Sequence, residues 1–576
     1  MTEPTMDAAP AAAGRLAPIL TRAALYTLLL AAICRVIQGN NLSVQLFRGQ
    51  DLGVLVLAAG ILLLLPLVKY APSMPRLRMS PASLVAAAAV LALLVAWAGT
   101  WLVFGGYALT RDEIAADFDA AFLAWGMLIA PVPAEWQSWV PALMPQFMLP
   151  MPASVGWLSA YLPGNSALRA IGIATIGADW VNPILAALAI LALYRVGRRL
   201  WPESPRLPLM PLLLLASSAQ FLTMAMTAYA MTAHLAFNLI WLACFLRRDR
   251  RGDVGALAAG FVATGLHQVL FHPLFVFPFI VSMWFSGERR RALAYVGAYA
   301  AIGLFWICYW QIALAGLGGG HATPGPGGVG YLVERVRLLL VSINGSAFTL
   351  MALNLARMLA WQNLLLVPLA LLAWPAIRRG QGIARPLAAG IALTFVTMLI
   401  LIPWQGHGWG YRYLHGFLGS FALLAAYGWQ SLAGTPDQGR RLGVLVLGSA
   451  ISLAVLLPIH LIQARDFVVP YRRAYAAIRA APVDVVLVDG TGLLYAEDLV
   501  RNAPDLSNRP RVMDMMALTG PGMVRLCRRY RVARFTAAEG RAWGIGASGA
   551  PLDWPPSTTR EHLLDRLKCG VRVPTP

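Results

Sequence analysis

The chain has 576 residues, of which 59% are hydrophobic and only 12% are charged. A soluble globular protein carries about 25% charged residues, so this composition excludes a soluble enzyme. The net charge of +20 does not indicate a nucleic-acid-binding protein, because the arginines stand in short clusters between apolar segments, as in the loops of membrane proteins. Since a backbone inside a bilayer must satisfy its own hydrogen bonds, we expect an all-α polytopic membrane protein.

The chain begins with residues 1–15, which are rich in alanine and proline and which we expect to be disordered. The first apolar segment, residues 16–37, contains Arg22 and Arg35. No cleavable signal peptide is recognisable, so we expect this segment to remain as a membrane anchor.

Thirteen apolar segments lie within residues 16–463, and we expect about 11–14 transmembrane helices from them, since about 20 residues cross the hydrocarbon core. The segments are 16–37, 52–69, 82–106, 168–194, 208–226, 229–246, 254–271, 273–286, 292–315, 361–377, 386–403, 413–431 and 442–462.

Basic clusters separate alternate pairs of these segments. They contain Lys69 and Arg78; Arg195, Arg198 and Arg199; Arg247, Arg248, Arg250 and Arg251; Arg289, Arg290 and Arg291; Arg378 and Arg379; and Arg440 and Arg441. With a cytoplasmic N-terminus, every cluster falls on the cytoplasmic side, as the positive-inside rule requires. Merging two of the segments would break this agreement.

Two long connections then lie on the opposite, extracytoplasmic side. Residues 107–166 are rich in tryptophan and proline and poor in basic residues, which predicts helices lying in the membrane interface. Residues 316–358 contain a Gly/Pro-rich loop at 316–330 and then an amphipathic stretch.

An odd number of spans places the tail, residues 465–576, outside the cytoplasm as a small α/β domain. Apolar runs at 483–488, 512–516 and 532–536 predict strands, and residues 495–501 predict a helix. The glycine pattern does not fit a dinucleotide site.

The cysteines show no metal-ligand spacing, and Cys34, Cys244 and Cys308 lie in or beside apolar segments. Cys527 and Cys569 lie in the polar tail, where a disulfide and two free thiols are both compatible with the sequence. No Walker, zinc or Gly-x-Ser-x-Gly motif is present, so we expect no cofactor, and the sequence leaves open whether a divalent metal assists.

The most acidic stretch of the first half of the chain is Thr110–Asp119, just outside the third span. On a helix, Asp112 and Asp119 share one face, and so do Glu113 and Asp117. A partly desolvated carboxylate at this place could act as a general base. The alternative is a solvated helix start, in which Asp112 and Glu113 only complement the helix dipole.

A second candidate stretch, Trp404–His415, is predicted on the same side. Its glycines permit close approach of a ligand, and an arginine can bind a phosphate through two parallel hydrogen bonds. The alternative is an interfacial aromatic belt with a snorkelling arginine. The candidate substrate-binding residues here are His407, Trp409, Tyr411, Arg412 and Tyr413.

Several further polar residues lie near predicted span ends. His267 and His272 are candidate lipid-phosphate contacts, although hydrogen-bonded histidines at a helix break explain them better, since their spacing is not that of a helical metal pair. His234 is expected to be a core residue. Weaker phosphate or loop candidates are Arg169, His321, Arg335 and Arg337.

The order of these features resembles the polytopic GT-C glycosyltransferases, particularly bacterial members similar to the dolichyl-phosphate-mannose-dependent and aminoarabinose transferase group. The resemblance covers about residues 80–430. It rests on the acidic pair and on the segments Gly156–Trp157, Tyr161–Gly164, Leu168–Gly172, Tyr194–Leu200, Ala216–Arg248 and Gly406–Gly416.

The resemblance implies transfer of a sugar from a polyprenyl-phosphate donor to a lipid, glycan or protein of the bacterial cell envelope, on the outer face of the inner membrane. It implies that Asp112 is the general base, with Glu113 as the second candidate. The chain departs from many relatives in having two spans before the one that precedes this pair. The alternatives are a transporter of lipid-linked saccharides and an O-antigen polymerase or ligase.

Overall fold

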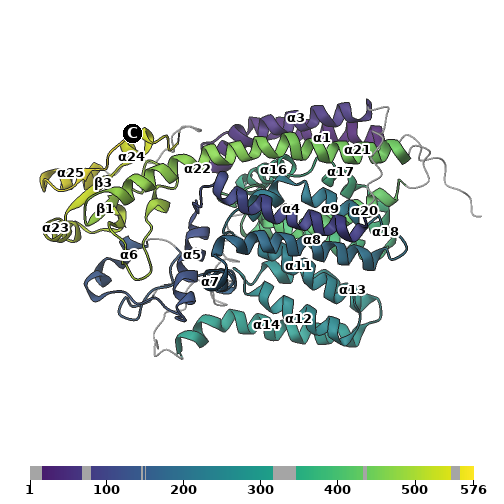
Figure 1. Cartoon of the computed structure of the whole chain (residues 1–576), viewed down its shortest axis with the longest axis horizontal. Coiled ribbons are helices and arrows are strands. Elements are labelled where there is room, and N and C mark those ends of the chain that lie inside the picture. The colour runs from purple at the N-terminus through teal and green to yellow at the C-terminus, as the bar shows by residue number, and fades with distance from the viewer. Residues whose placement is uncertain are drawn as a thin grey trace, which may run out of the picture.

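The computed structural model describes residues 16–67, 79–144, 147–149, 151–315, 345–432, 438–546 and 558–576. A bundle of helices forms the larger part of the molecule, and a small α/β domain lies at one end of it (Figure 1). His321, Arg335 and Arg337 lie outside the described residues.

The helical part runs in chain order from the N-terminus. Its α-helices are α1 (Leu16–Val36), α2 (Leu42–Leu46), α3 (Leu52–Leu64), α4 (Pro81–Leu102), α5 (Arg111–Ala124), α6 (Val140–Leu143), α7 (Gly164–Thr175), α8 (Val181–Leu200), α9 (Leu209–Ala216), α10 (Ala219–Ala225), α11 (Met231–Phe245), α12 (Arg250–Thr264), α13 (Phe271–Phe285), α14 (Arg289–Ala315), α16 (Gly345–Ala360), α17 (Leu366–Leu371), α18 (Trp374–Arg379), α19 (Ala384–Leu401), α20 (Leu418–Gln430), α21 (Gln438–Ile451) and α22 (Leu457–Ala480). Shorter 3-10 or π turns join them, of which η1 (Phe47–Asp51) and η5 (Arg412–Phe417) matter for the site.

The protein is a multi-pass membrane protein. In the part of the chain that the structure describes, seven helices are long and apolar enough to cross a membrane. They are Leu16–Val36, Leu42–Leu67, Pro81–Leu102, Ala178–Leu200, Arg289–Ala315, Ala384–Leu401 and Gly439–Ala480. Met231–Phe245 and Phe271–Phe285 are apolar but shorter.

Several of the predicted spans are broken into shorter helices. The predicted segments 208–226 and 229–246 form α9, α10 and α11, and the segment 361–377 forms α17 and α18. Breaks at membrane depth require partners for the freed backbone groups. Asn182 supplies them at one break, where its Nδ2 donates to the carbonyls of Thr227 (2.5 Å) and Tyr229 (2.9 Å). A hydropathy profile does not register such side-chain support.

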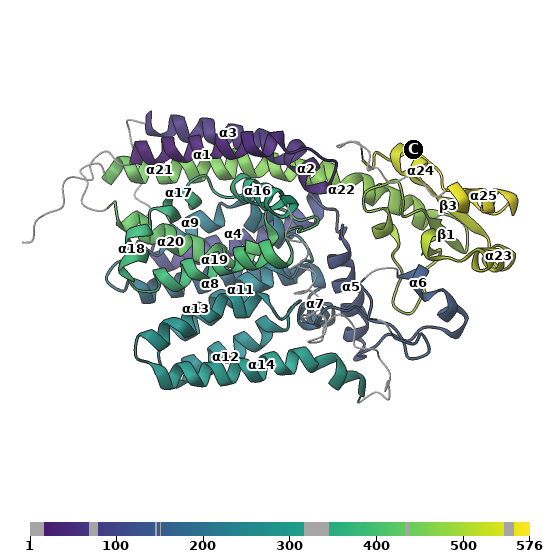
Figure 2. The same ribbon diagram turned by 180° about the vertical axis from the view of Figure 1, so that it is seen from behind.

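Among the described residues, the basic clusters gather at the end of the bundle away from the α/β domain (Figure 1). Arg291 pairs with Asp253 (2.7 Å) and Glu288 (3.0 Å), and Arg248 also pairs with Glu288 (2.9 Å). These ion pairs join the α11–α12 and α13–α14 connections. Figures 1 and 2 place α18 and the start of α21 at the same end.

The last helix of the bundle, α22, continues without a break to Ala480, so the predicted domain boundary at residue 465 falls inside a helix. Beyond it, the C-terminal domain (residues 481–576) contains a parallel sheet in the order β2-β1-β3-β4. Its elements are β1 (Val485–Val488), β2 (Arg511–Asp514), α23 (Gly520–Arg529), β3 (Val532–Phe535), α24 (Ala537–Ala542), α25 (Thr558–Arg566) and β4 (Val571–Arg572). The predicted strands are confirmed, whereas residues 496–499 form only a 3-10 turn, η7 (Ala496–Leu499).

The tryptophan-rich outer segment buries most of its tryptophan rings in protein, whereas Trp125 is 53% exposed. Trp136 and Trp157 are only 1% and 2% exposed, and they share a hydrophobic core with Met513 and Leu526 of the C-terminal domain. The Nε1 of Trp157 donates to the carbonyl of Pro504 at 2.8 Å. These rings are buried by a domain that is distant in sequence, which composition alone does not reveal.

Candidate active site

Helix α5 begins at the predicted acidic stretch because a glutamate caps it. The Oε2 of Glu113 accepts from the backbone N–H groups of Leu109 (3.1 Å) and Thr110 (3.3 Å). Its Oε1 accepts from the N–H of Ala228 at 3.2 Å, in the break between α10 and α11. Burial raises the pKa of Glu113 to about 7. Glu113 thus connects the start of α5 to the turn between α10 and α11 and holds Asp112 in the first turn of α5. Because Glu113 is buried, the start of α5 is not a solvated helix end.

The two predicted candidate stretches meet in one ion pair. The carboxylate of Asp112, from α5, pairs with the guanidinium of Arg412, at the start of η5. Tyr161, from the outer segment, donates its hydroxyl to the other oxygen of Asp112. Burial raises the pKa of Asp112, but Arg412, His267 and Tyr161 outweigh it, so the net pKa lies below the ordinary value. Asp112 is therefore an ionised, hydrogen-bonded carboxylate.

His267, one of the candidate lipid-phosphate contacts, lies beside this pair. Its ring stacks on Tyr161 with centroids 4.1 Å apart. Burial lowers the pKa of His267 to about 4, so its imidazole is neutral at physiological pH. Neither ring nitrogen has a hydrogen-bond partner among the described residues.

Arg412 is held by aromatic rings as well as by Asp112. Its guanidinium lies 5.6 Å from the ring centroid of Tyr229 and 5.3 Å from that of Tyr413. The backbone N–H of Arg412 donates to Oε1 of Gln405 at 3.0 Å. Such a fixed guanidinium can present parallel N–H groups to a phosphate.

Tyr229 connects the broken helix to this site. The hydroxyl of Thr110 donates to the hydroxyl of Tyr229 at 2.7 Å, and the Tyr229 hydroxyl contacts the carbonyl of His407 at 3.4 Å. Tyr161 and Tyr229 were not identified from the sequence as site residues. Both stand in segments that carried the family resemblance, which is the only sequence signal that could have found them.

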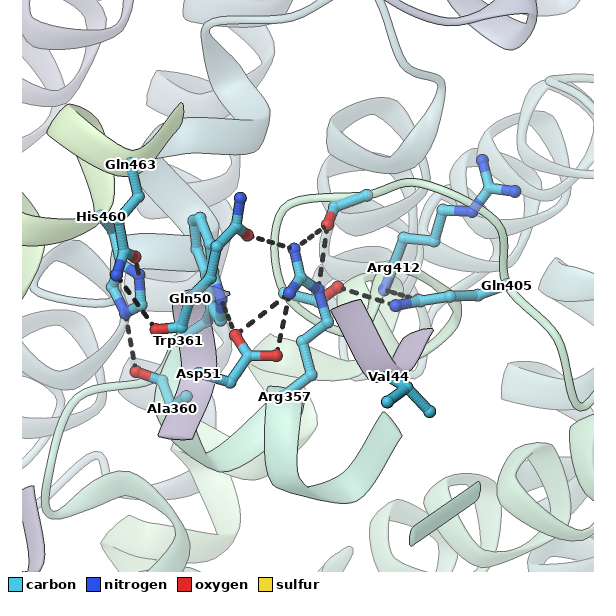
Figure 3. A network of polar contacts seen from close by, with 12 residues as sticks. Val44, Gln50, Asp51, Arg357, Ala360, Trp361, Gln405, Arg412, His460 and Gln463 are labelled. Carbon is cyan, nitrogen blue, oxygen red and sulfur yellow. Dashed lines mark hydrogen bonds and ion pairs between the residues drawn. The ribbon is translucent and has the colours of Figure 1, made fainter. Parts of the chain in front are cut away.

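A second buried ion pair holds the loop between α19 and η5, residues 402–411, in place. Arg357 of α16 donates to Asp51 of η1 (2.9 Å) and to the carbonyl of Gly408, from Nε at 3.1 Å and Nη2 at 2.6 Å. Trp361 also donates to Asp51 at 2.8 Å. Figure 3 shows Arg357 between Asp51 and the loop that leads to Arg412. Sequence reasoning missed this pair, because its partners lie more than 300 positions apart.

Most aromatic residues of the stretch Trp404–His415 face protein, whereas Trp404 is 52% exposed. Trp409 and Tyr411 are 1% and 0% exposed, and Tyr413 is 8% exposed. The ring of His407, 3% exposed, stacks on Phe467 with centroids 5.0 Å apart. These residues shape the walls around Arg412.

Two predicted binding residues do not join the Asp112 cluster. The ring nitrogens of His272 contact Oδ1 of Asn238 (2.7 Å) and the hydroxyl of Tyr299 (2.8 Å), as in a hydrogen-bonded core histidine. Arg169 pairs with Asp117 at 2.5 Å. Among the described residues, no group of three or more His, Cys, Asp or Glu side chains could hold a metal ion.

No protein-family model and no curated protein sequence matches the chain. Solved structures do. The crystal structure of ArnT from Cupriavidus metallidurans bound to undecaprenyl phosphate aligns with a TM-score of 0.51, over 74% of this chain and 85% of that chain, at 13% identity. ArnT is an aminoarabinose transferase of the GT-C type. The membrane part of this protein has a GT-C fold.

Two other structures with a GT-C fold align less closely. ArnT from the same organism in the apo state gives a TM-score of 0.48, with 13% identity over 73% of this chain and 84% of that chain. The arabinofuranosyltransferase AftD from Mycobacteria gives 0.38, with 15% identity over 77% of this chain and 32% of that chain. At these identities the similarity concerns the fold.

Proposed function

We propose that this protein is a GT-C glycosyltransferase that moves a sugar from a polyprenyl-phosphate donor to an acceptor of the cell envelope. The observation that carries the proposal is the Asp112–Arg412 pair at one end of a GT-C fold. The ArnT structure with undecaprenyl phosphate supports a lipid of the same kind here. The site would lie on the extracytoplasmic face of the bacterial inner membrane, because the basic clusters that the structure describes occupy the opposite end of the bundle.

In the proposed reaction, Asp112 takes the proton of the acceptor hydroxyl. The acceptor oxygen attacks the anomeric carbon, the bond from that carbon to the phosphate oxygen breaks, and the electron pair leaves with the polyprenyl phosphate. Attack opposite the leaving group inverts the anomeric carbon. Arg412 stabilises the negative charge on the departing phosphate, which is a charge-assisted contact inside a desolvated site.

Donor binding would activate the base. The donor phosphate competes with Asp112 for Arg412, and a carboxylate that loses its cationic partner in a buried place has a higher pKa. Burial already acts to raise the pKa of Asp112 and is outweighed only by its partners, with Arg412 first among them. Asp112 would therefore become a stronger base only when a donor is present, which limits unproductive chemistry.

The test is the variant Asp112→Asn, assayed for sugar transfer from a labelled undecaprenyl-phosphate monosaccharide. We expect the loss of a general base to reduce kcat by about 10²–10⁴-fold while the variant still binds the donor lipid. The matched control is Glu135→Gln, which removes an exposed outer-segment carboxylate that pairs with Arg529 at 3.6 Å and accepts from Nε1 of Trp136 at 2.8 Å. A glutamine oxygen at this position can still accept from Trp136. Transfer by Asp112→Asn at the control rate would remove Asp112 from the mechanism.

Two rival functions give different outcomes in the same assay. A saccharide transporter would move the labelled lipid between leaflets of a vesicle without forming a new glycosidic bond. A polymerase or ligase would use diphosphate-linked oligosaccharides and leave the monophosphate donor unchanged. Either result with the wild-type protein would contradict the proposed activity.

A further inference from the structure

Several buried polar groups beside the Asp112–Arg412 pair have no hydrogen-bond partner among the described residues. They include both ring nitrogens of His407, the Nε of Arg412 and the hydroxyl of Tyr495. A buried polar atom left without a partner costs about 1–3 kcal/mol. When several such atoms lie close together, one polar ligand that hydrogen-bonds to all of them explains their burial.

His407 is the most enclosed of these groups. In the sequence, His407 stands between two glycines that approach the Arg412 side chain. A Cβ on Gly408 would stand 3.1 Å from Cδ of Arg412, and one on Gly406 would stand 3.6 Å from Nη2 of Arg412. Burial lowers the pKa of His407 well below its ordinary value, and Arg357 and Arg412 add to this effect. The neutral imidazole therefore offers one hydrogen-bond donor and one acceptor.

Tyr495 comes from the C-terminal domain, in the loop that follows β1. Its ring meets the ring of His407 edge to face, with centroids 5.9 Å apart. Its φ of 53° is unusual for a residue with a side chain and carries a backbone cost. Burial raises the pKa of Tyr495 well above its ordinary value, and Asp498 adds to the effect, so the phenol keeps its proton and remains a donor.

The loop that carries Tyr495 is fastened on both sides. The hydroxyl of Tyr471 in α22 donates to the carbonyl of Leu494 at 2.8 Å. Arg111, the residue before Asp112, donates to the carbonyl of Glu497 at 2.5 Å and pairs with Asp498 at 2.9 Å. A strained residue held by such anchors indicates that the position of its side chain matters.

We propose that Tyr495 and His407 form the subsite that hydrogen-bonds the sugar ring of the donor lipid. The proposal rests on the proposed function and names the part of the donor that the C-terminal domain recognises. Neutral donors and acceptors beside aromatic rings suit the hydroxyls and C–H faces of a sugar, and do not suit a second charged group. The donor is favoured because its sugar is joined directly to the phosphate, and His407 adjoins the arginine proposed to bind that phosphate.

The test compares a lipid with a sugar against the same lipid without one. We would measure Kd for undecaprenyl-phosphate glucose, mannose and arabinose and for bare undecaprenyl phosphate, in detergent, with the full-length protein. For the best-bound sugar lipid, we expect Tyr495→Phe to raise Kd by about 3- to 10-fold, the effect of one neutral hydrogen bond. His407→Gln should act in the same direction. Binding of bare undecaprenyl phosphate should stay unchanged in Tyr495→Phe.

The matched control is Tyr530→Phe. Its hydroxyl also lacks a partner among the described residues, but its ring stacks on Trp136, at 4.9 Å between centroids, in the core of the outer segment. Equal weakening of both lipids by Tyr495→Phe, or no weakening of the sugar lipid, would overturn the subsite and leave the proposed function standing. If the wild-type protein binds neither lipid, the proposed function itself fails and the subsite with it.

Discussion

At the scale of single residues, the site depends on one carboxylate and one guanidinium that neutralise each other. Asp112 and Arg412 are each 12% exposed at the side chain, so water screens their interaction only weakly. A pair of this kind keeps the base ionised and the cation in place before any substrate arrives. It also means that the two groups cannot be altered independently.

The first prediction concerns the pH dependence of transfer. In the free enzyme Arg412 holds the pKa of Asp112 below its ordinary value, so the acidic limb of kcat/KM should lie at low pH. In Arg412→Gln burial acts without the cation, the pKa of Asp112 rises, and the limb should move to higher pH. In the wild-type protein, the acidic limb of kcat should lie at higher pH than the acidic limb of kcat/KM, because the bound donor occupies Arg412. An acidic limb at the same pH in the wild type and in Arg412→Gln would show that Arg412 does not control the pKa of Asp112.

The second prediction concerns Asp119, which accepts from the N–H of Ser159 at 3.0 Å and also from its hydroxyl. Burial raises the pKa of Asp119 to about 7, well above the value of about 3.9 in an unfolded chain. The raised pKa means that protonated Asp119 contributes to the free energy of unfolding. This contribution is present in full below the pKa of the unfolded chain and is lost as the pH rises through the pKa of the folded state. Between about pH 5 and pH 8, Tm should therefore fall less in Asp119→Asn than in the wild type, measured in detergent. A parallel fall in both proteins would show that Asp119 does not titrate.

At the scale of elements, the loop 402–411 is positioned by helices that carry no catalytic group. Asp51 of η1 and Arg357 of α16 are 1% and 4% exposed at their side chains. Their pair fixes the carbonyl of Gly408, and Gln220 of α10 donates to the carbonyl of Tyr411 at 2.9 Å. Helices distant in sequence therefore decide where Arg412 stands.

The third prediction separates stability from positioning at this ion pair. Asp51→Leu alone or Arg357→Met alone leaves a buried charge without its partner, which costs about 3–5 kcal/mol. The double variant removes both charges, so its Tm should recover toward the wild-type value. Its transfer rate should stay low, because Gly408 still lacks its donors. Recovery of stability and activity together would show that Arg357 does not position the loop.

At the scale of the whole molecule, the C-terminal domain and the outer segment pack together as one body. They share a hydrophobic core that includes Phe118, Trp157, Met513 and Leu526. The contact continues to the site through Arg111 and Asp498, which are 3% and 5% exposed at their side chains. The domain at the end of the chain thereby reaches the neighbourhood of the acidic pair, which tail composition alone did not suggest.

The fourth prediction tests the side of the membrane on which this body lies. Cys527 and Cys569 form a disulfide, which persists in an oxidising compartment. In intact bacteria, alkylation of these cysteines should therefore require a reductant, and a phosphatase reporter fused after Ala480 should be active. An inactive phosphatase fusion, or cysteines that are alkylated without a reductant, would place the domain in the cytoplasm and contradict the proposed topology.

The sequence alone determined the membrane class, the α/β nature of the tail and the two stretches that carry Asp112 and Arg412. These features depend on composition and on local patterns, which hydropathy and charge report directly. They also predicted that both stretches lie on one side, because the basic clusters mark the other. Sequence could not choose between a disulfide and free thiols at Cys527 and Cys569, since that choice depends on their distance in space.

Only the tertiary structure decided which of the candidates act together. It joined Asp112 to Arg412, separated His272 and Arg169 from them, and added Tyr161, Tyr229 and the Asp51–Arg357 pair. It also converted several apparent spans into broken helices. The physical reason is the same in each case: buried polar groups are satisfied by partners distant in the chain, and such pairings leave no periodic trace in the sequence.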